Sequence, residues 1–497
     1  MTYDLVVIGG GPAGVAGALT AARAGLRVAL VDTGARLGGQ YFRHPAVPGS
    51  APGLDRFLRQ ARALGERADL LLRHQVWNVS RDPDGGELTV HCLTRDPAPG
   101  PADTTASTGS TGSTGSRGSL GERPVAVRAR RLLIATGAYD RPLPFPGWDL
   151  PGVLTAGGAQ ALLKGNGVVA GRRIVVSGTG PFLLPVATGL AGAGARVLGV
   201  FEAGGGLGLA RHPLLALGKA GEAAGYAATL ARHRVPYHTR QAVVAAHGDR
   251  EVEAVTVARL DKEWNVLATR VVACDTLATG YGFVPQIELG TQLGCQTRPD
   301  ADGGPVLSVD AAQRTTVPGV WAAGEPTGVG GWRLAELEGR IAGQTIAADA
   351  RDGVRGAPSA RPAPVAGAQG LLEGVAGVLL RRRERWRAFG TALQRAYLVE
   401  PGWQGWLRAD TLVCRCEEVP LARVREAQEL GATDARSIKL LARPGMGWCQ
   451  GRICGYAISC LAGGPHTPPR RPIAQPVTLG ALAETDDTPG PDDHPAR

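Results

Sequence analysis

The feature that most constrains this sequence is a glycine turn near the N-terminus, set between an apolar run and a helix of small residues. Leu5–Ile8 is followed by Gly9-Gly10-Gly11-Pro12-Ala13-Gly14, a small-residue segment over 13–24 and a second apolar run over 26–31. Glycine at 9 permits a tight turn, glycine at 11 lets backbone approach a pyrophosphate, and glycine at 14 lets the helix pack closely on the sheet.

Phosphates bound at this turn would lie at a helix N-terminus, where free N–H groups and the helix dipole favour anions. Asp32 ends the second apolar run, where a carboxylate can accept hydrogen bonds from a ribose. The pattern therefore predicts a β-α-β dinucleotide-binding unit. Its predicted ligand contacts are Gly9, Gly11, Pro12, Ala13, Gly14 and Asp32.

A second unit of the same kind is predicted over residues 173–202. Its turn, Ser177-Gly178-Thr179-Gly180-Pro181-Phe182-Leu183, has the first two glycines but a leucine in place of the third. Leucine there would push the helix away from the strand, and Pro181 removes one N–H from the helix start. Glu202 could still bind a ribose. We expect the fold to be retained with weak or absent dinucleotide binding, and retained binding stays the alternative.

The 497 residues are too many for one hydrophobic core, so several domains are expected. The expected ranges are 1–157 and 283–350 for the two parts of the first dinucleotide domain, 158–282 for the second, and 409–465 for a cysteine domain. Residues 351–370 are predicted to form a linker, 371–408 a helical connector and 466–497 a disordered tail. A disordered Ser/Thr/Gly-rich insertion over about 96–123 is expected to interrupt a hairpin formed by Leu88–Leu93 and Val125–Ala129.

The net charge of +10 does not indicate nucleic-acid binding, because the arginines are scattered and no binding motif accompanies them. The densest cluster, residues 381–385, lies in a helical pattern and suits a solvated face or a docking surface. The N-terminus lacks the basic flank of a signal peptide. The uncharged stretch 174–195 contains glycines and two prolines, which favours a strand–turn–helix over a membrane span. We therefore expect a cytoplasmic protein that is not integral to a membrane.

Four cysteines form two close pairs near the C-terminus. Cys414-Arg415-Cys416 is followed after thirty-two residues by Cys449 and then Cys454. Clustered cysteines in a cytoplasmic chain indicate metal, and four thiolates suit zinc or an iron–sulfur cluster. A Cys-x-Cys pair fits structural zinc less well, although zinc and a metal-free thiol cluster stay open. Helix starts are expected after Cys416 and around 449–454, where N–H groups would offset negative charge. The remaining cysteines, expected to be buried fillers, are Cys92, Cys274, Cys295 and Cys460.

Three further segments resemble the pyridine-nucleotide-disulfide-reductase-like superfamily. They are Gly38-Gly39-Gln40, Leu133-Ile134-Ala135-Thr136-Gly137-Ala138 and Val320-Trp321-Ala322-Ala323-Gly324-Glu325. The resemblance implies bound FAD, an NAD(P)H-type second domain, and a flavin ribityl contact from the acidic residue of the last segment. That residue is usually Asp, so Glu325 is a conservative departure. The FAD contacts added on this basis are Gly39, Gln40, Val76, Thr136, Gly137, Gly324 and Glu325.

The cysteine spacing and the stretch Arg443–Arg452 resemble the [2Fe–2S] domain of bacterioferritin-associated ferredoxins. Together with the FAD motifs, the chain is similar to the flavoprotein α subunit of heteromeric dye-linked amine dehydrogenases, a group that includes opine oxidases, hydrogen cyanide synthases and D-hydroxyproline dehydrogenases. Segments 151–160, 280–285 and 324–331 also resemble that group. The expected fold is α/β, with two dinucleotide-binding domains of FAD/NAD(P)-reductase type and a small helical [2Fe–2S] ferredoxin-like domain.

This resemblance implies a division of labour between subunits. A partner of D-amino-acid-oxidase type would oxidise the C–N bond of an amino acid, imino acid or opine. This chain would relay the electrons through FAD and a cluster held by Cys414, Cys416, Cys449 and Cys454 to a quinone-like acceptor. A small ferredoxin-like subunit is a further candidate partner. An NAD(P)H-dependent reductase that feeds its own cluster and a non-enzymatic assembly protein stay open, and no catalytic acid or base can be assigned.

Overall fold

The structure is a computed structural model that describes residues 2–45, 53–82, 86–95, 122–205, 220–353, 377–468 and 472–486. Its first dinucleotide fold is a parallel sheet in the strand order β21-β8-β2-β3-β4. These strands are β2 (Leu5–Ile8), β3 (Val28–Asp32), β4 (Asp69–Leu72), β8 (Leu132–Ile134) and β21 (Val320–Ala322). The strands are mostly apolar, and the central ones are buried on both faces, as expected of a parallel sheet between two layers.

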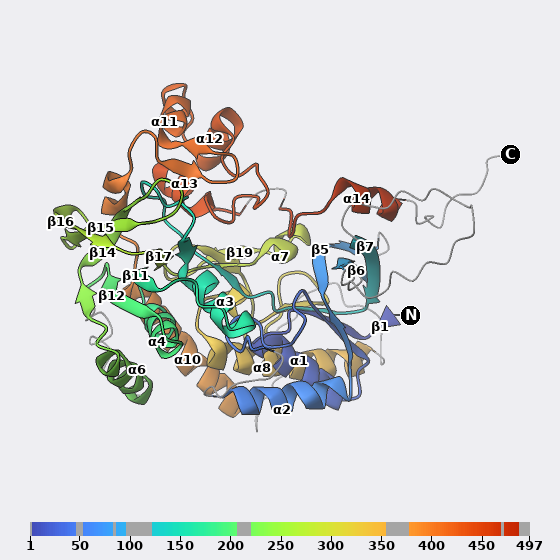
Figure 1. The fold of residues 1–497 in the computed structure, drawn as a ribbon. Helices are drawn as coiled ribbons and strands as arrows, with labels where there is room; N and C mark the ends of the chain where they lie inside the picture. Colours follow the sequence, from blue (N-terminus) through green and yellow to red (C-terminus); the bar gives the residue numbers. More distant parts are fainter. Residues whose placement is uncertain are drawn as a thin grey trace, which may run out of the picture.

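Three helices cover one face of this sheet: α1 (Pro12–Arg23), α2 (Leu54–Gly65) and α8 (Trp332–Gly353) (Figure 1). Small residues let α1 and α8 cross closely, since a Cβ on Gly339 would lie 2.0 Å from the Ala13 carbonyl oxygen. The other face packs against a second sheet in the order β1-β7-β6-β5. Its strands are β1 (Thr2–Tyr3), β5 (His74–Arg81), β6 (Leu88–Arg95) and β7 (Glu122–Ala129).

The antiparallel pairing of β6 with β7 confirms the predicted hairpin. Most of the Ser/Thr/Gly-rich insertion between these strands lies outside the described residues. The chain between residues 288 and 327 also contains four short elements: α7 (Glu288–Gln292), β19 (Thr297–Pro299), β20 (Pro305–Leu307) and the short helix η2 (Glu325–Thr327).

The second dinucleotide fold is a parallel sheet in the order β10-β17-β11-β12-β13. Its strands are β10 (Val153–Thr155), β11 (Arg173–Gly178), β12 (Arg196–Glu202), β13 (Tyr237–Thr239) and β17 (Thr276–Gly280). Its helices are α3 (Ala156–Asn166), α4 (Leu183–Gly192) and α6 (Ala220–Arg232), and a three-stranded sheet of β14 (Gln241–His247), β15 (Ala254–Leu260) and β16 (Val266–Ala273) packs beside it.

Strand β11 and helix α4 occupy the uncharged stretch 174–195, which confirms the strand–turn–helix prediction. The two dinucleotide folds are joined by the antiparallel pair β9 (Ala138–Asp140) and β18 (Phe283–Pro285). The predicted α/β fold with two dinucleotide-type domains is therefore confirmed. In the part of the chain that the structure describes, no helix is long and apolar enough to cross a bilayer.

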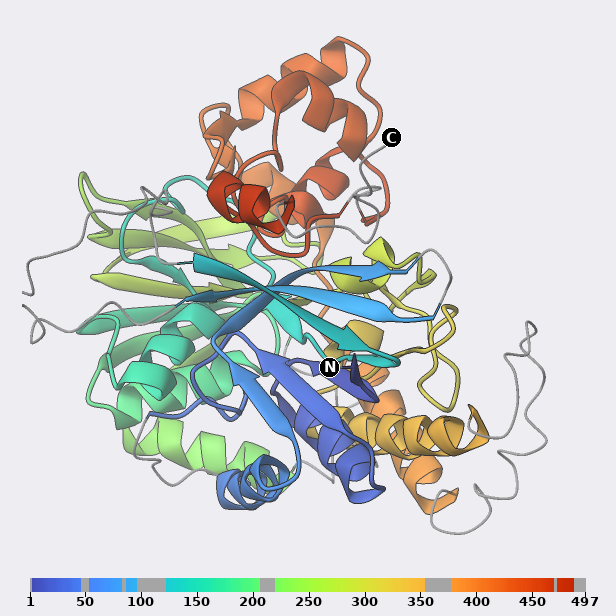
Figure 2. The same cartoon turned by 90° about the vertical axis from the view of Figure 1, so that its right-hand side faces the viewer.

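The C-terminal part begins with α10 (Gly377–Ala396), which packs against α8, and the short helix η4 (Pro401–Trp406). A small lobe follows, seen in orange and red above the second dinucleotide fold in Figure 1 and at the top of Figure 2. It contains β22 (Leu412–Cys414), β23 (Val419–Pro420), α11 (Leu421–Glu429), α12 (Ala435–Ala442) and α13 (Gly455–Leu461). We call residues 409–465 the cysteine module. Residues 354–376, which include most of the expected linker, lie outside the described residues.

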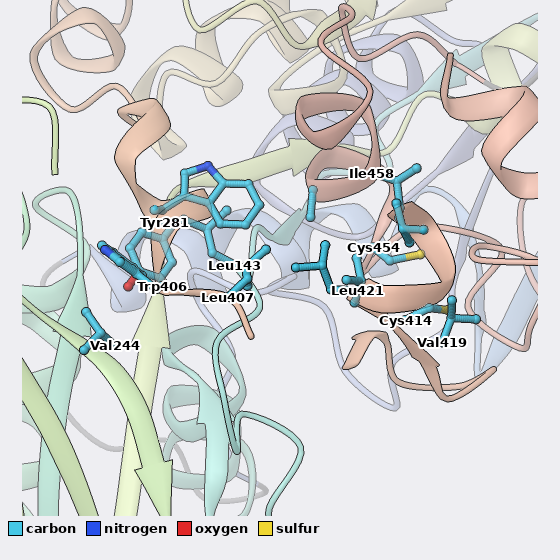
Figure 3. Close-up of a cluster of buried hydrophobic side chains, with 14 of the residues drawn as sticks. Leu143, Val244, Tyr281, Trp406, Leu407, Cys414, Val419, Leu421, Cys454 and Ile458 are labelled. Atoms are coloured by element: carbon cyan, nitrogen blue, oxygen red, sulfur yellow. The ribbon is translucent and has the colours of Figure 1, made fainter. Parts of the chain in front are cut away.

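One apolar cluster joins the cysteine module to the second dinucleotide domain. It runs from Val244 through Tyr281, Trp406 and Leu407 to the module residues around Cys414 and Ile458 (Figure 3). Because the cluster is continuous, the module shares a core with the domain below it.

The tail does not follow the expectation of disorder over residues 472–486. This segment crosses the first domain and ends in α14 (Leu479–Asp486), beside β7. Its backbone accepts hydrogen bonds from Gln75 Nε2 to Pro476 O (3.2 Å) and from Gln292 Nε2 to Pro472 O (3.1 Å), and Ala474 is buried. These contacts with distant residues order a segment whose composition alone favours disorder. Residues 487–497 lie outside the described residues.

Candidate functional site

The first glycine turn has the geometry that its sequence requires. Gly9 has φ +111°, and a Cβ there would lie 2.2 Å from the Ala135 carbonyl oxygen. A Cβ on Gly14 would lie 1.8 Å from the Gly9 oxygen, whereas the nearest atom to a Cβ on Gly11 is 3.9 Å away. Positions 9 and 14 therefore fix the backbone, and position 11 faces open space. Pro12 starts α1, the buried Ala13 follows it, and no side chain caps this helix start, so its first turn could bind a phosphate.

Asp32 lies at the carboxyl end of β3, beside this turn. Its carboxylate accepts the N–H of Gly10 at 2.5 Å and that of Gly34 at 2.6 Å. Burial raises the pKa of Asp32, and these two N–H groups oppose the increase. The side chain keeps partial exposure, so an outer lone pair can still accept a ribose hydroxyl.

The loop after β3 closes over the turn. Gly38 and Gly39 have positive φ, and a Cβ on Gly39 would lie 3.0 Å from Gly11 Cα. The structure thus brings Gly39 to the phosphate turn and leaves Gln40 exposed. Val76 is buried in β5, opposite Cys92, in the same core cluster as Ile8 and Val31. Its contact with FAD stays a prediction.

Thr136, Gly137 and Gly324 lie at the carboxyl ends of β8 and β21, the same sheet edge as the glycine turn. Ligands of open parallel sheets bind at this edge. Thr136 Oγ1 donates to Gln286 O at 2.7 Å, and Gly137 O accepts the Gln286 N–H at 3.0 Å. Gly137 and Gly324 have φ +84° and +82°. These contacts fix the strand ends beside the glycine turn, and we call this edge the candidate flavin cradle.

Glu325 has a local role in the structure. Its carboxylate accepts the N–H groups of Gly330 and Gly331 at 3.1 and 3.0 Å. Burial raises the pKa of Glu325 to about 7, against these N–H groups and Arg387. Its ribityl contact stays a prediction.

A buried ion-pair cluster around Glu338 was missed by the sequence analysis. The Glu338 side chain has 0% exposure and accepts Gly324 N at 3.0 Å and Thr327 Oγ1 at 2.9 Å. Arg383 and Arg387 of α10 both pair with its carboxylate, and Arg387 also donates to Gly328 O at 2.8 Å. Helix α10 therefore clamps the loop that follows Gly324. The arginines were visible in the sequence, but their partner lies 45 or more residues away.

The second glycine turn differs from the first at the start of its helix. Pro12 begins α1, but α4 begins two residues after the corresponding Pro181, at the buried Leu183. The Glu202 side chain is fully buried. It accepts Thr179 Oγ1 at 2.6 Å and the N–H groups of Gly180 and Gly204 at 2.8 and 2.9 Å. Burial raises the pKa of Glu202, and these three donors oppose the increase. Its carboxylate is thus engaged by the chain itself.

The connector η4 packs where β12 ends. Trp403 and Trp406 share a core with Ala203 and Tyr281, and Trp406 stacks on Trp264 with the ring centroids 6.0 Å apart. Burial, with a smaller contribution from the Glu202 carboxylate, raises the pKa of the Tyr397 phenol to about 12. The chain therefore covers the strand end at which a second dinucleotide would lie.

The four predicted cysteine ligands come together in the cysteine module. Sulfur–sulfur distances are 3.8 Å between Cys414 and Cys416 and 3.8 Å between Cys416 and Cys449, and the Cys454 thiol hydrogen-bonds to Cys414. Cys414 and Cys454 are buried, Cys449 is half-buried and Cys416 is exposed. Within the described ranges, no three His, Cys, Asp or Glu side chains are arranged as ligands of a single metal ion.

A cavity of about 240 Å³ lies between the cysteine module and the second dinucleotide fold. All four cysteines line it, together with Thr155 and Thr279 at the ends of β10 and β17 and Trp148. Two glycines allow the close approach of the loops: a Cβ on Gly447 would lie 2.7 Å from Cys416 Sγ, and Gly445 has φ +77°. The sulfurs thus border a space instead of converging on one point.

Backbone N–H groups stabilise negative charge on Cys414. Gly445 N donates to its sulfur at 3.5 Å. The hydrogen bond from Cys454 lowers the pKa of Cys414 to about 5, with Gly445 and Glu417 N–H contributing, and it raises the pKa of Cys454. The expected helix start after Cys416 is wrong, since β23 intervenes before α11 begins at Leu421, but α13 does begin directly after Cys454.

The other cysteines differ in burial. Cys92, Cys274 and Cys295 are buried, as expected, and burial raises the pKa of each thiol. Cys460 is only half-buried, at the edge of the core shared with the cysteine module.

Similarities to known proteins extend over most of the chain. Residues 3–350 match the pyridine nucleotide-disulphide oxidoreductase family. The chain is 34% identical to the HcnB subunit of hydrogen cyanide synthase from Pseudomonas aeruginosa, over 97% of this chain and 98% of that protein. It is 31% identical to an opine oxidase subunit from Agrobacterium tumefaciens, over 92% of this chain and 85% of that protein.

Among solved structures, L-proline dehydrogenase from P. horikoshii has the same fold, with a TM-score of 0.61 and 20% identity over 97% of this chain and 79% of that chain. These similarities confirm the resemblance drawn from the motifs. The chain belongs to the pyridine nucleotide-disulphide oxidoreductase family, as a flavoprotein oxidoreductase subunit related to HcnB and to the opine oxidase subunit.

Proposed function

We propose that this chain is the electron-relaying subunit of a heteromeric dehydrogenase that oxidises an amino acid, an imino acid or an opine. The observation that carries the proposal is the gathering of four cysteines at one cavity, in a chain that keeps a complete glycine turn for a flavin dinucleotide. Its relatives in hydrogen cyanide synthase and opine oxidase are named as enzyme subunits, which supports a partner subunit.

FAD is the proposed dinucleotide of the first fold. The turn around Gly11 and the first turn of α1 would bind its pyrophosphate, and Asp32 would accept a ribose hydroxyl. The loop at Gly39 and the strand ends at Gly137 and Gly324 would hold the rest of the cofactor. When bound, FAD supplies the capacity to accept two electrons and release them singly.

A [2Fe–2S] cluster is the proposed occupant of the cysteine cavity. Four thiolates are its usual ligands. A space bordered by four sulfurs suits a two-iron cluster better than one zinc ion, which needs its ligands around a single point. The Gly445 N–H on Cys414 offsets part of the negative charge of such a cluster. The cysteine module would therefore act as a ferredoxin-like domain.

The second dinucleotide fold argues against the alternative of an NAD(P)H-dependent reductase. Glu202 has both carboxylate oxygens engaged and its side chain fully buried. Leu183 replaces the third glycine, and η4 covers the end of β12. We propose that this fold supports the cysteine module and receives no electrons from a nicotinamide.

Electrons would reach this chain from a partner of D-amino-acid-oxidase type and leave it for a quinone-like acceptor. Cys416 is the exposed member of the four cysteines, so the exit would lie at its side of the cavity. A cytoplasmic location and a further small ferredoxin-like subunit belong to the same proposal.

Anaerobic titration of the purified flavoprotein tests this function against the alternative. Dithionite is expected to bleach the flavin and the cluster, whereas equimolar NADH or NADPH leaves both oxidised. Prompt bleaching by either nucleotide would establish the reductase instead. A Cys454→Ser variant provides the second arm. It should lose acid-labile sulfide and keep its flavin, and retention of full sulfide would exclude the proposed ligand set.

A further inference from the structure

Two side chains at strand β9 face the cysteine module. Tyr139 lies in the strand and Arg141 directly follows it, so the two are two residues apart in extended chain and point to the same side. The strand begins directly after Thr136 and Gly137, at the sheet edge assigned to the flavin. Opposite them lie Arg452, in the loop between Cys449 and Cys454, and Tyr456, at the start of α13.

The first contact joins Tyr139 to Arg452. Arg452 Nε donates to the Tyr139 hydroxyl at 2.9 Å, and the guanidinium lies 5.5 Å from the centroid of the Tyr139 ring. Arg452 Nη1 donates in turn to the Cys449 carbonyl oxygen at 3.1 Å. A continuous bonded route therefore runs from the candidate flavin cradle to a candidate cluster ligand.

The second contact is also between an arginine and a tyrosine, but here the arginine lies beside β9 and the tyrosine lies in the cysteine module. The Arg141 guanidinium lies 4.3 Å from the centroid of the Tyr456 ring. Arg141 is held by its ion pair with Asp302 and by a hydrogen bond to Phe283 O at 2.8 Å. Tyr456 follows the ligand candidate Cys454 by two residues. Each side of the interface thus supplies one tyrosine and one arginine, and cation–π contacts of this kind gain strength when they are desolvated.

Arg452 also ties two more segments to the interface. It pairs with Glu288 of α7 at 3.3 Å and donates to the carbonyl oxygens of Ile473, at 2.6 Å, and Ala474 in the ordered tail. Its side chain is only 9% exposed. A guanidinium offers five N–H donors in a rigid fork, which a lysine cannot reproduce. One side chain therefore fixes the cysteine loop, β9, α7 and the tail together.

We infer that the reciprocal pairs Tyr139–Arg452 and Arg141–Tyr456 are the positioning junction that holds the cysteine cavity at a fixed place relative to the flavin site. This inference rests on the proposed function, because a positioning role has a purpose only if an electron passes between the two sites. With flavin and cluster bound, one electron would pass from the reduced flavin to the oxidised cluster, and no covalent bond of the chain would form or break. A fixed separation then sets the rate of that transfer.

Hydrogen exchange on the full chain tests the junction without reference to activity. The variants are Tyr139→Phe, which removes one hydroxyl, and Arg452→Lys, which keeps the charge and removes the fork. Their controls are Tyr3→Phe, which loses a hydroxyl bonded to Asp69, and Arg423→Lys, in an exposed pair with Glu426. Both junction variants should speed exchange at 137–141 and 449–456, and Arg452→Lys also at 472–475. Exchange that stays unchanged, or rises only at 449–456, would overturn the junction.

Photochemical reduction of the flavin in the loaded protein supplies the second readout. The electron should reach the cluster roughly tenfold more slowly in Arg452→Lys than in the wild type and the controls, at equal flavin and sulfide content, because small displacements have large effects on rate. An equal rate in the variant would refute the positioning role. A wild-type protein without labile sulfide would instead refute the proposed relay, and the exchange experiment would still decide whether the junction exists.

Discussion

The carbonyl oxygen of Gly9 lies where a side chain at position 14 would begin. A Cβ on Gly14 would be 1.8 Å from that oxygen, and both atoms belong to the candidate flavin turn. A larger residue must therefore separate α1 from β2, which moves the first turn of the helix away from the bound phosphates.

Gly14→Ala is expected to lower the flavin content of the purified protein several-fold and to destabilise the first domain by about 1–3 kcal/mol, the usual cost of overpacking. Flavin absorbance per chain and thermal unfolding measure the two effects. The control is Gly225→Ala, at an exposed position in α6 with open space around its Cβ, where alanine should stabilise the helix slightly. Equal flavin content in the two variants would show that Gly14 does not shape the binding turn.

His466 lies beside the junction and is expected to make the stability of the protein depend on pH. Burial, with the nearby charge of Arg141, lowers the pKa of His466 to about 4, and Asp302 opposes this effect. The unfolded chain protonates this histidine near pH 6.5, so it binds the proton first as the pH falls. The contribution to stability is therefore present above pH 6.5 and is lost progressively toward pH 4.

Between pH 7.5 and 5.5, the wild type should lose about 1 kcal/mol of unfolding free energy relative to His466→Gln. Urea unfolding at each pH measures the difference, and His233→Gln, at an exposed site, is the control. A difference between wild type and His466→Gln that is constant with pH would show that the fold does not favour the neutral form of His466.

Buried ion pairs help to attach helix α10 to the first domain. Glu338 of α8 has no solvent exposure, and Arg387 contacts its carboxylate, Thr327 Oγ1 and Gly328 O. Removing one partner of a buried ion pair leaves a charge without compensation, which costs more than the pair itself contributes. The loop after Gly324 would lose its support at the same time.

Arg387→Leu is expected to destabilise the protein by about 3 kcal/mol, because Arg383 compensates only part of the Glu338 charge. Arg385→Leu, on the exposed side of the same helix, should change stability by less than about 0.5 kcal/mol. Chemical unfolding of both variants compares the two positions. Similar losses in the two would mean that α10 docks by apolar packing alone.

The elements that could be predicted are those whose sequence repeats a local pattern. The strands β2, β3 and β11 and the hairpin β6–β7 follow from apolar periodicity and glycine position. The two acidic strand ends, Asp32 and Glu202, were also predicted. Their different surroundings could not be, because the closure of the turn around Glu202 depends on three donors placed by the fold.

Contacts between distant segments were beyond prediction from one sequence. Arg452 and Tyr139 lie 313 residues apart, and nothing in the composition of either segment indicates the other. The order of residues 472–486 depends on the same kind of contact, since Ile473 and Ala474 are held by Arg452. The cysteines were found because ligand spacing is local, whereas the cavity between them and the second domain is a product of docking.

The molecule as a whole places its two candidate redox sites on either side of β9. The first dinucleotide fold holds the candidate flavin turn. The cysteine module, the orange and red lobe at the top of Figure 2, borders a cavity with the strand ends of the second fold. A fold that in its family binds a nicotinamide would here act as a support. The proposed relay therefore requires both sites to be filled in one chain.

Chemical analysis of the full-length protein, purified without air, tests that claim most directly. Flavin, iron, zinc and acid-labile sulfide are measured per chain, with the reduced sample examined by electron paramagnetic resonance. We predict about one flavin, two irons and two sulfides per chain. Stoichiometric zinc without sulfide, or a chain without flavin, would contradict it.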